Sequence, residues 1–356
     1  MESKFLDYLR DPIGQDDLDF HQFEAEEEQI ISAVFVNPIT KAAYPIVGGV
    51  PIMLPNSFPK EFLDKFSSEL AEVNEKYEGN LRFQKSDLSW SFSAEWEHHF
   101  NTELSKTWGY SVQERYDQFL LNIQSSKEEL QGKFVLDGGC GNGDLTKEFA
   151  INGSIAFGVD YSESVLFAEK HRDNKNTCFV RADLRFLPFR KDLFDVIVAN
   201  GVIHHTPSTE KTFHAIAPFV KKEGKYYVWL YSEKGNFGWR VKRKFFDFSR
   251  IIVCRLPEKM QDWIVSLYVS ILKLIYPKSN KDRMKIAMYD SITPRWRYYH
   301  TPEEVAHWYH QAGFGPVVLT HFDNVYGFGV YAPKIPQEQT PGNHFGEKVN
   351  YHMNEA

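Results

Sequence analysis

The sequence predicts an α/β protein whose core is a parallel sheet covered by helices, and three observations predict it. Short apolar runs typical of buried strands alternate with helical patterns from Lys133 to Tyr231. A glycine-rich turn follows the first of these runs, at residues 138–143. Two later apolar runs, 316–322 and 326–332, predict a final antiparallel pair. Strands that alternate with helices in this way specify a parallel sheet with helices on both faces.

The elements of this core are expected in a regular order. Strands are predicted at 133–137, 155–160, 177–181, 194–200 and 225–231, with helices at 144–152, 162–172 and 209–220. A later helix is expected to begin at Thr301 and end at Gly313, because Thr is a good N-cap and Pro302 suits the first turn. Residues 236–300 interrupt this order and are predicted to form a helical, basic and aromatic insert.

The segments outside the core differ in pattern. Residues 1–57 are expected to form a small β unit, because β-rich runs between Ile30 and Leu54 alternate with Pro and Gly turns. Residues 58–131 are helical and aromatic in pattern and could serve as a linker or as a lid. The α/β domain is placed at 132–335, and the polar tail at 336–356 is expected to be mobile.

Composition excludes several classes of protein. The chain has 356 residues and a formal net charge of -7, which argues against indiscriminate binding to nucleic acid. Three widely spaced cysteines predict neither a disulfide framework nor a zinc site. No apolar run approaches the roughly 18 to 20 residues that span a bilayer, and the first residues have no signal-peptide pattern. We therefore expect a cytoplasmic protein.

The glycine-rich turn begins with Asp137 and ends with Asp144, in the sequence D-G-G-C-G-N-G-D. Glycines there let the backbone lie against a ligand, and the helix that follows presents free N–H groups. A dinucleotide fingerprint needs a third Gly where this chain has Asp144, and an acid would repel a pyrophosphate. S-adenosylmethionine has no phosphate and carries two cationic groups, so the acids suit it. The alternative is a tight turn that binds no ligand.

Polar side chains also follow the next strands. Asp160 ends the second strand, Asp183 follows the third, and Asn200 ends the fourth. The carboxyl ends of parallel strands meet at one edge, which is where open α/β sheets bind ligands. A carboxylate at Asp160 can accept both hydroxyls of a ribose, so these strand ends together suit one adenosyl ligand.

On these residues the chain resembles the class I S-adenosylmethionine-dependent methyltransferases, in particular their small-molecule branch. The resemblance rests on 135–143, 158–162, 182–189 and 194–205. It implies a Rossmann-like, seven-stranded sheet with its last strand antiparallel and S-adenosylmethionine as the cofactor. It places glycines of the turn against the cofactor, Asp160 on the ribose, Asp183 near the adenine and Asn200 near the methionine moiety. The candidate cofactor-binding residues are Asp137, Gly139, Gly141, Gly143, Asp160, Tyr161, Asp183, Leu184 and Asn200.

A second resemblance covers the N-terminal unit. Residues 11–14 and 37–40 look like the two knuckles of a Trm112-type zinc ribbon that has lost its cysteines. The four ligand positions are now Asp11, Gly14, Asn37 and Thr40. Without a thiolate, a structural zinc ion is not expected, so the resemblance implies the fold without the metal.

His204 and His205 follow the fourth strand, at the rim where an acceptor would meet the methyl group. A histidine there could act as a general base, because imidazole titrates near neutral pH. The alternative is that the pair only shapes a loop, since methyl transfer can proceed by positioning alone.

The insert and the segment after it carry the candidate acceptor-binding residues. Tyr289, Arg295, Arg297 and Tyr298 combine arginines with aromatic rings, which suits carboxylate, phosphate or sugar recognition, or else anchors the insert. Residues 240–285 contain twelve Lys or Arg and four Asp or Glu, a net charge of +8. This stretch could contact a membrane surface, or it could be a helical unit with a solvated basic face.

We therefore predict methyl transfer from S-adenosylmethionine to an O, N or C atom of a small-molecule acceptor, which could be anionic, sugar-linked or lipid-linked. One alternative is a degenerate methyltransferase scaffold that binds another protein through its ribbon. Another is an RNA methyltransferase, which the basic stretch favours and the overall acidity disfavours.

Overall fold

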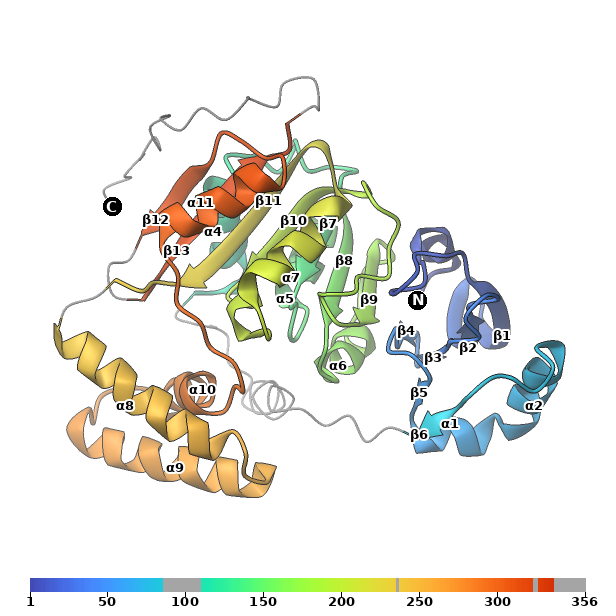
Figure 1. Cartoon of the computed structure of the whole chain (residues 1–356), viewed down its shortest axis with the longest axis horizontal. Coiled ribbons are helices and arrows are strands. Elements are labelled where there is room, and N and C mark those ends of the chain that lie inside the picture. The colour runs from blue at the N-terminus through green and yellow to red at the C-terminus, as the bar shows by residue number, and fades with distance from the viewer. Residues whose placement is uncertain (86–109, 235–236, 323–325, 336–356) are drawn as a thin grey trace.

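The computed structural model describes residues 1–85, 110–234, 237–322 and 326–335, and its centre is a seven-stranded sheet (Figure 1). The strand order is β12-β13-β11-β10-β7-β8-β9. The strands are β7 (Phe134–Gly138), β8 (Ile155–Asp160), β9 (Thr177–Arg181), β10 (Phe194–Asn200), β11 (Val220–Tyr231), β12 (Val318–Phe322) and β13 (Gly327–Pro333). The strands from β7 to β11 pair in parallel, and β13 is antiparallel to β11 and β12. The predicted Rossmann-like sheet with an antiparallel last strand is confirmed.

The order of the strands reverses at one point of the sheet. The chain passes from β7 outward through β8 to β9, and then returns to place β10 on the other side of β7. Ligands bind at the carboxyl ends of strands where the order reverses in this way. The reversal lies between β7 and β10, so the glycine-rich turn after β7 stands at the predicted site.

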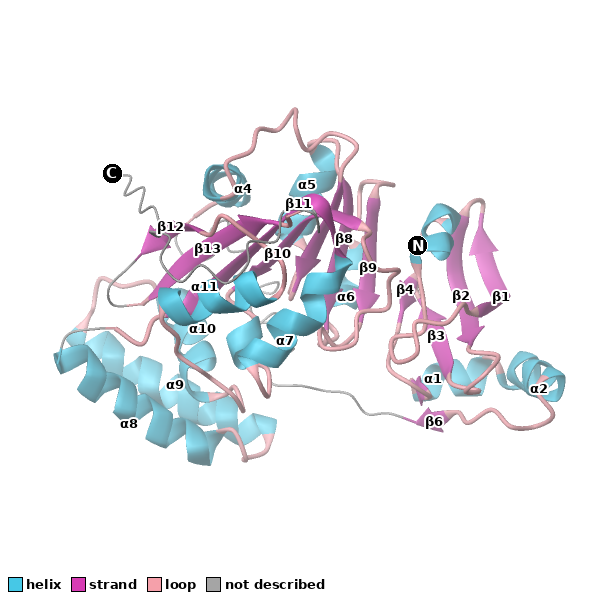
Figure 2. Cartoon of the chain, turned by 45° about the horizontal axis from the view of Figure 1, so that its top comes forward, coloured by secondary structure: helices cyan, strands magenta, loops and turns pink. Residues whose placement is uncertain are grey.

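Helices cover both faces of the sheet (Figure 2). On one face, α4 (Val112–Asn122) and α5 (Asp144–Ile151) pack through Phe149, whose ring meets Tyr116 and Phe119 edge to face. On the other face, α7 (Thr209–Ile216) and α11 (Pro302–Gln311) pack through Phe213 and Tyr309. The sheet is therefore buried on both sides, which explains the nearly continuous apolar runs of its central strands. Helix α6 (Ser164–Lys170) lies beside β9.

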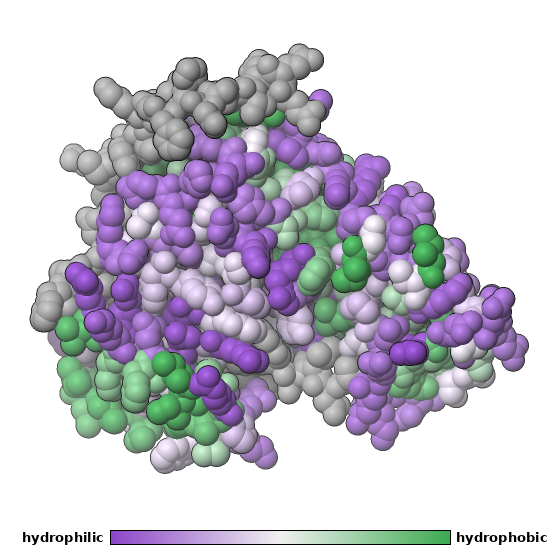
Figure 3. Space-filling view, in the orientation of Figure 1, coloured by the Kyte–Doolittle hydropathy of each residue, from purple (hydrophilic) through white to green (hydrophobic). Residues whose placement is uncertain are grey.

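The insert, for which the sequence predicts helix without giving a number, consists of α8 (Phe237–Val253), α9 (Glu258–Ile275) and α10 (Lys281–Ile292). Apolar side chains such as Val253, Val265 and Met288 are buried between them. The outer side of α8 and α9 is an apolar surface (Figure 3). Over the described ranges of the chain, no helix combines the length and apolarity needed to cross a bilayer.

The N-terminal unit is a four-stranded antiparallel sheet preceded by a 3₁₀ helix, η1 (Ser3–Tyr8). Its strands are β1 (Asp19–Glu26), β2 (Gln29–Val36), β3 (Ala43–Val47) and β4 (Val50–Pro51). β1 extends the unit beyond the predicted runs. None of its residues is buried, and four of its eight side chains are acids or amides, so the sequence gives only a weak strand signal there. After it come β5 (Ser57–Phe58), α1 (Lys60–Lys65), α2 (Ser67–Lys76) and β6 (Gln84–Lys85). Residues 86–109 of the segment predicted to be helical and aromatic lie outside the described residues, as does the tail at 336–356.

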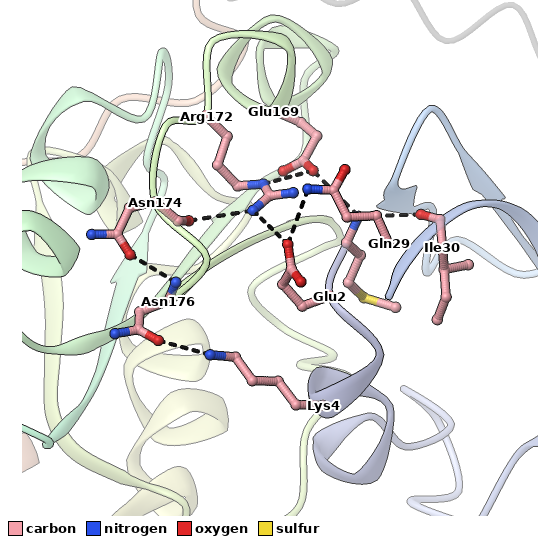
Figure 4. A network of polar contacts seen from close by, with 9 residues as sticks. Glu2, Lys4, Gln29, Ile30, Glu169, Arg172, Asn174 and Asn176 are labelled. Atoms are coloured by element: carbon pink, nitrogen blue, oxygen red, sulfur yellow. Dashed lines mark hydrogen bonds and ion pairs between the residues drawn. The ribbon is translucent and has the colours of Figure 1, made fainter. Parts of the chain in front are cut away.

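This unit packs directly on the edge of the central sheet. The amide of Met53 donates to the carbonyl of Arg181 in β9 at 2.8 Å, and Phe5 meets Phe157 of β8 edge to face. A polar network also joins the two parts, and in it Arg172 lies 3.1 Å from Glu2 and 2.9 Å from Glu169 (Figure 4). The unit and the α/β domain therefore share one hydrophobic core.

Two turns of this unit occupy the positions of the suggested zinc knuckles. Oδ2 of Asp11 accepts from the amides of Ile13 at 3.1 Å and Gly14 at 2.5 Å. Oδ1 of Asn37 accepts from the amides of Ile39 at 2.8 Å and Thr40 at 3.0 Å. Both side chains are buried, so these hydrogen bonds close each turn without a metal. No group of three or more metal-ligating side chains occurs in the described part of the chain. The ribbon resemblance itself stays a prediction.

Replacing Asp11 with alanine is expected to lower the free energy of unfolding by about 2–3 kcal/mol, because two turn amides and the hydroxyl of Tyr44 lose a buried acceptor. Urea unfolding measures this change. Asp17→Ala is the control, because Asp17 is exposed and forms only a surface pair with Arg10. Equal losses in the two variants would contradict the role given to Asp11.

Candidate active site

The glycine-rich turn has the backbone shape that glycine favours. Gly139, Gly141 and Gly143 have φ values of 76°, 54° and 74°. A Cβ on Gly139 would lie 2.4 Å from the methyl groups of Val202, which follows β10. A Cβ on Gly143 would lie 2.5 Å from the ring of Phe179, inside the protein. Gly143 thus serves close packing and the start of α5, whereas Gly139 lies against Val202, where the strand order reverses between β7 and β10.

Asp160 lies against this turn. Its Oδ2 accepts from the amide of Gly141 at 2.9 Å, and its Oδ1 accepts from the amide and hydroxyl of Ser162 at 2.8 and 2.7 Å. A carboxylate offers about four lone-pair positions, so acceptor capacity remains. Tyr161 follows directly at the end of β8. The end of β8 and the glycine-rich turn are therefore in contact, as one shared ligand site requires.

The other predicted strand ends line the same edge with different local partners. Leu184 lies over the end of β7, because a Cβ on Gly138 would be 3.3 Å from its side chain. Asp183 is held by Arg185, whose Nη2 and Nε lie 2.5 and 3.0 Å from Oδ2. Asn200 is exposed at the end of β10. Recognition of an adenine amino group by Asp183 would therefore require Arg185 to share that carboxylate.

Asp137 is buried below the turn. The hydroxyl of Thr146 donates to its Oδ2 at 2.7 Å. Burial raises the pKa of Asp137 to about 6, although the Thr146 hydrogen bond and the charge of Arg115 act in the opposite direction. Asp137 therefore sits below the turn and titrates near neutral pH.

Arg115 of α4 lies near the acids of the turn, and it was not among the site residues predicted from the sequence. Its Nη1 is buried and has no hydrogen-bond partner within the described ranges, and its charge interacts with Asp137 and Asp144. Burial lowers its pKa, and the two acids raise it. A buried guanidinium N–H without an acceptor suits an anionic group of a ligand. The available signal was weak: the capping box of Ser111 and Glu114 marks the start of α4 but not its neighbours.

Asp137 gives the stability of the protein a specific pH dependence. The pKa of Asp137 in the folded protein is about 6, above the ordinary value of 3.8. The protonated side chain therefore adds to the free energy of unfolding below about pH 4, and this addition is lost as the pH rises through 6. The loss amounts to about 3 kcal/mol at most. Asp137→Asn should remove it, so the difference in unfolding free energy between variant and wild type should change between pH 4 and pH 7. Urea unfolding at several pH values in this range measures the difference. If the free energies of unfolding of the two proteins changed with pH in parallel, the raised pKa of Asp137 would be contradicted.

The two histidines after β10 differ in their surroundings. His204 is fully buried, with its ring 4.3 Å from that of Tyr231, and burial lowers its pKa well below the usual value. Neither of its ring nitrogens has a hydrogen-bond partner among the described residues. The Nδ1 of His205 is 3.0 Å from the carbonyl of Trp296, and its Nε2 is 3.2 Å from Oδ1 of Asp290. Both ring nitrogens of His205 therefore face oxygen atoms that can accept a hydrogen bond.

Asp290 of α10 joins this pair to the insert. The hydroxyl of Tyr231 donates to Oδ2 of Asp290, and Arg297 lies over the ring of Tyr231 at 4.3 Å from its centroid. Burial by itself would raise the pKa of Asp290, but contacts with His205, Arg297 and Tyr231 outweigh it and lower the pKa to about 2. The result is a buried, charged and aromatic cluster at the end of β11.

The four predicted acceptor-binding residues do not lie together. Arg297 belongs to the cluster around Asp290, at 4.0 Å from its Oδ2. Tyr289 is buried inside the insert, where its hydroxyl donates to Asp262. Arg295 is exposed, and the hydroxyl of exposed Tyr298 donates to the carbonyl of Pro207. Neighbours on a helix point about 100° apart, so Tyr289 faces α9 while Asp290 faces His205.

The cluster and the glycine-rich turn open on the same edge of the sheet. Trp229 pairs with Asn200 across β10 and β11, and its carbonyl accepts from the amide of Gly201 at 3.1 Å. The ring of Trp229 is 6.2 Å from that of His204. A seven-stranded sheet of this order, with a glycine-rich turn and an acid at the next strand end, defines a class I methyltransferase domain.

Comparison with known proteins gives the same result. Residues 136–228 match the family described as "Methyltransferase domain", and this part of the chain is a class I S-adenosylmethionine-dependent methyltransferase domain. A ubiquinone biosynthesis O-methyltransferase of Coxiella burnetii is 34% identical over 99 residues, covering 27% of this chain and 42% of the relative. A probable tRNA methyltransferase 9B of Mus musculus is 28% identical over 178 residues, covering 45% of this chain and 38% of the relative. The chain thus spans less than half the length of these relatives.

Solved structures with a similar arrangement include magnesium protoporphyrin IX methyltransferase from Synechocystis PCC 6803, with a TM-score of 0.40 and 15% identity over 76% of this chain and 97% of that one. Another is a complex of the Haloferax volcanii Trm112 methyltransferase activator with a methyltransferase, with a TM-score of 0.43 and 14% identity over 70% of this chain and 100% of that one.

Proposed function

We propose that this protein is an enzyme that transfers the methyl group of S-adenosylmethionine to an O, N or C atom of a small-molecule acceptor. The observation that carries the proposal is the contact between Asp160 and the glycine-rich turn, at 2.9 Å from the amide of Gly141. This contact brings a carboxylate and the backbone of the glycine-rich turn together at the edge where the strand order reverses. The relatives named ubiquinone biosynthesis O-methyltransferases support a small-molecule acceptor.

The residues present fit the cofactor. Asp160 would hold the ribose, the backbone near Gly139 would approach the ligand, and Arg115 would hold the carboxylate of the methionine moiety. When bound, S-adenosylmethionine supplies an electrophilic methyl group on a sulfonium. Asp137, Asp144 and Asp160 give this edge of the sheet the negative charge that suits a cationic ligand.

The acceptor side is proposed at the cluster around Asp290. Arg297 and the rings of Tyr231 and Tyr299 present a cation between aromatic faces, 4.3 and 5.6 Å from the two ring centroids. This combination suits a planar or anionic acceptor. Tyr289 packs inside the insert and supports it, while exposed Arg295 and Tyr298 are proposed for the rim.

Isothermal titration calorimetry with S-adenosylmethionine and with its demethylated product tests the proposal. Both ligands should bind the wild-type chain with a stoichiometry of one. An absence of binding to folded protein would end the proposal. Binding without turnover on a broad panel of phenol, amine and carboxylate acceptors would favour the degenerate scaffold instead. The apolar face of the N-terminal unit is already buried against its own domain, which argues against a ribbon free to bind a partner.

His205 is proposed to position rather than to accept a proton, because Nε2 faces the carboxylate of Asp290 and Nδ1 faces a carbonyl. His205→Gln is expected to lower kcat about tenfold while leaving the acid limb of the pH–rate profile in place. A general base would give a loss of about 10²–10⁴-fold and a flattened acid limb. His204→Gln should mainly lower stability, since His204 is fully buried.

A second candidate function is RNA methylation. The similarity to a probable tRNA methyltransferase and the net charge of +8 over residues 240–285 favour it. Neutralising phosphates makes binding fall steeply with salt, so tRNA binding should then weaken by orders of magnitude between low and moderate salt. A flat salt response, or no binding, would dismiss this function.

A further inference from the structure

The outer faces of α8 and α9 carry exposed apolar side chains at helical spacing. On α8 these are Val241, Phe245, Phe248 and Ile252, and on α9 they are Met260, Trp263, Leu267, Ile271 and Leu274. Steps of three or four residues place each set on one side of its helix. Exposure is large: Phe248 is 66%, Trp263 65% and Leu274 84% exposed. The opposite sides bury residues such as Val253 and Val265, so core packing does not explain these two stripes.

The two stripes belong to one surface. Helices α8 and α9 are joined by a short turn at 254–257 and contact each other through Tyr268, whose hydroxyl lies 3.2 Å from that of Ser249. The ring of Phe245 is 6.4 Å from the ring of Tyr268. Apolar side chains gather over the two helices at the lower left of the space-filling view (Figure 3). This outer surface of α8 and α9 is here called the insert face.

Positive charge surrounds the insert face. Exposed basic side chains lie along it and at its ends: Arg240, Lys244, Arg255, Lys259, Lys278 and Lys281. Residues 240–285 carry +8, so the rest of the chain carries -7 - 8 = -15. A basic apolar face on an acidic body has one preferred orientation toward a negatively charged surface.

We propose that the insert face lies on an anionic lipid bilayer. Large apolar side chains, a tryptophan among them, flanked by Lys and Arg are the features of helices that lie in a membrane interface. None of the described helices is suited to span a bilayer, so the contact is peripheral. The face is outward and stretches along two helices, which suits a broad surface better than a single peptide. This inference does not depend on methyl transfer.

Vesicle flotation tests the proposal with the full chain. Vesicles of phosphatidylcholine mixed with phosphatidylglycerol should carry the protein, and vesicles of phosphatidylcholine alone should carry at least about tenfold less. Added salt should weaken the binding. Phe248→Ser combined with Trp263→Ser should reduce binding to the mixed vesicles at least about tenfold. Lys244→Gln combined with Lys259→Gln should lower binding to the mixed vesicles and weaken its salt dependence, because two of the six basic side chains lose their charge.

Matched controls replace an exposed apolar and an exposed basic residue far from the insert face. Ile151→Ser and Lys191→Gln should leave flotation unchanged, since both lie on the α/β domain. Unchanged affinity for S-adenosylmethionine or unchanged circular dichroism shows that each variant is folded. Flotation that is absent in mixed vesicles, or equal in variants and wild type, overturns the proposal. Self-association of wild type that the Phe248 and Trp263 changes abolish, without vesicle binding, assigns the face to a second copy and also overturns it.

Discussion

Replacing Asp160 with asparagine is expected to raise the dissociation constant for S-adenosylmethionine about 100-fold, or about 2.8 kcal/mol. Asp160 is the residue predicted to accept the ribose hydroxyls, and its carboxylate also contacts the glycine-rich turn through the amide of Gly141. Hydrogen bonds to a charged acceptor are worth about 1.5–3 kcal/mol each, and the amide loses both the charge and one acceptor. Calorimetry measures the change directly, without any acceptor.

Ser162→Ala provides the matched control, because it removes the hydroxyl that donates to Asp160 at 2.7 Å but keeps the carboxylate. Its effect on binding should stay within about threefold. Urea unfolding of both variants separates loss of the site from loss of the fold. A dissociation constant for Asp160→Asn near that of the wild type would place the ribose elsewhere.

Much of the central sheet could be predicted from the sequence because its strands are buried on both faces. The run from Phe194 to Asn200 is apolar at nearly every position, and its bounds agree with β10. By contrast, β1 has no buried residue and is rich in acids, so its hydrophobic pattern is weak. The packing of Phe5 on Phe157 joins residues far apart in the chain, and no local pattern reports it. The shared core of the two units therefore emerged only in the structure.

The residues of the candidate site also differ in how well the sequence predicts them. Positions in the glycine-rich turn and at strand ends could be found because backbone geometry restricts which residues fit there. Side chains on helices could not be assigned, because one residue step turns the direction by about 100°. The sequence favoured Tyr289, whereas the structure brings its neighbour Asp290 to His205. Arg115 was missed for a related reason, since its partners Asp137 and Asp144 lie in two other elements, β7 and α5.

Replacing Arg115 with glutamine is expected to weaken S-adenosylmethionine binding about 10- to 100-fold, about 1.4–2.8 kcal/mol. Among the described residues, the buried Nη1 of Arg115 has no hydrogen-bond acceptor, and it lies beside the turn. A contact between a guanidinium and a carboxylate is among the stronger hydrogen bonds. Arg115→Lys should recover part of the loss, because it keeps the charge but not the fork of donors. Gln118→Ala, on the same helix, is the matched control and should bind normally.

The decisive comparison uses 5′-methylthioadenosine, which has the adenosine and sulfur of the cofactor but no amino-acid part. If Arg115 holds the methionine carboxylate, Arg115→Gln should bind this ligand as tightly as wild type does, while Asp160→Asn should lose both ligands. Removal of Arg115 should also raise the pKa of Asp137 further, because its charge is one of the influences that lower it. The pH at which Asp137→Asn and wild type diverge in stability would then move upward in an Arg115→Gln background. Equal losses for the two ligands would instead assign Arg115 to the folding of the turn.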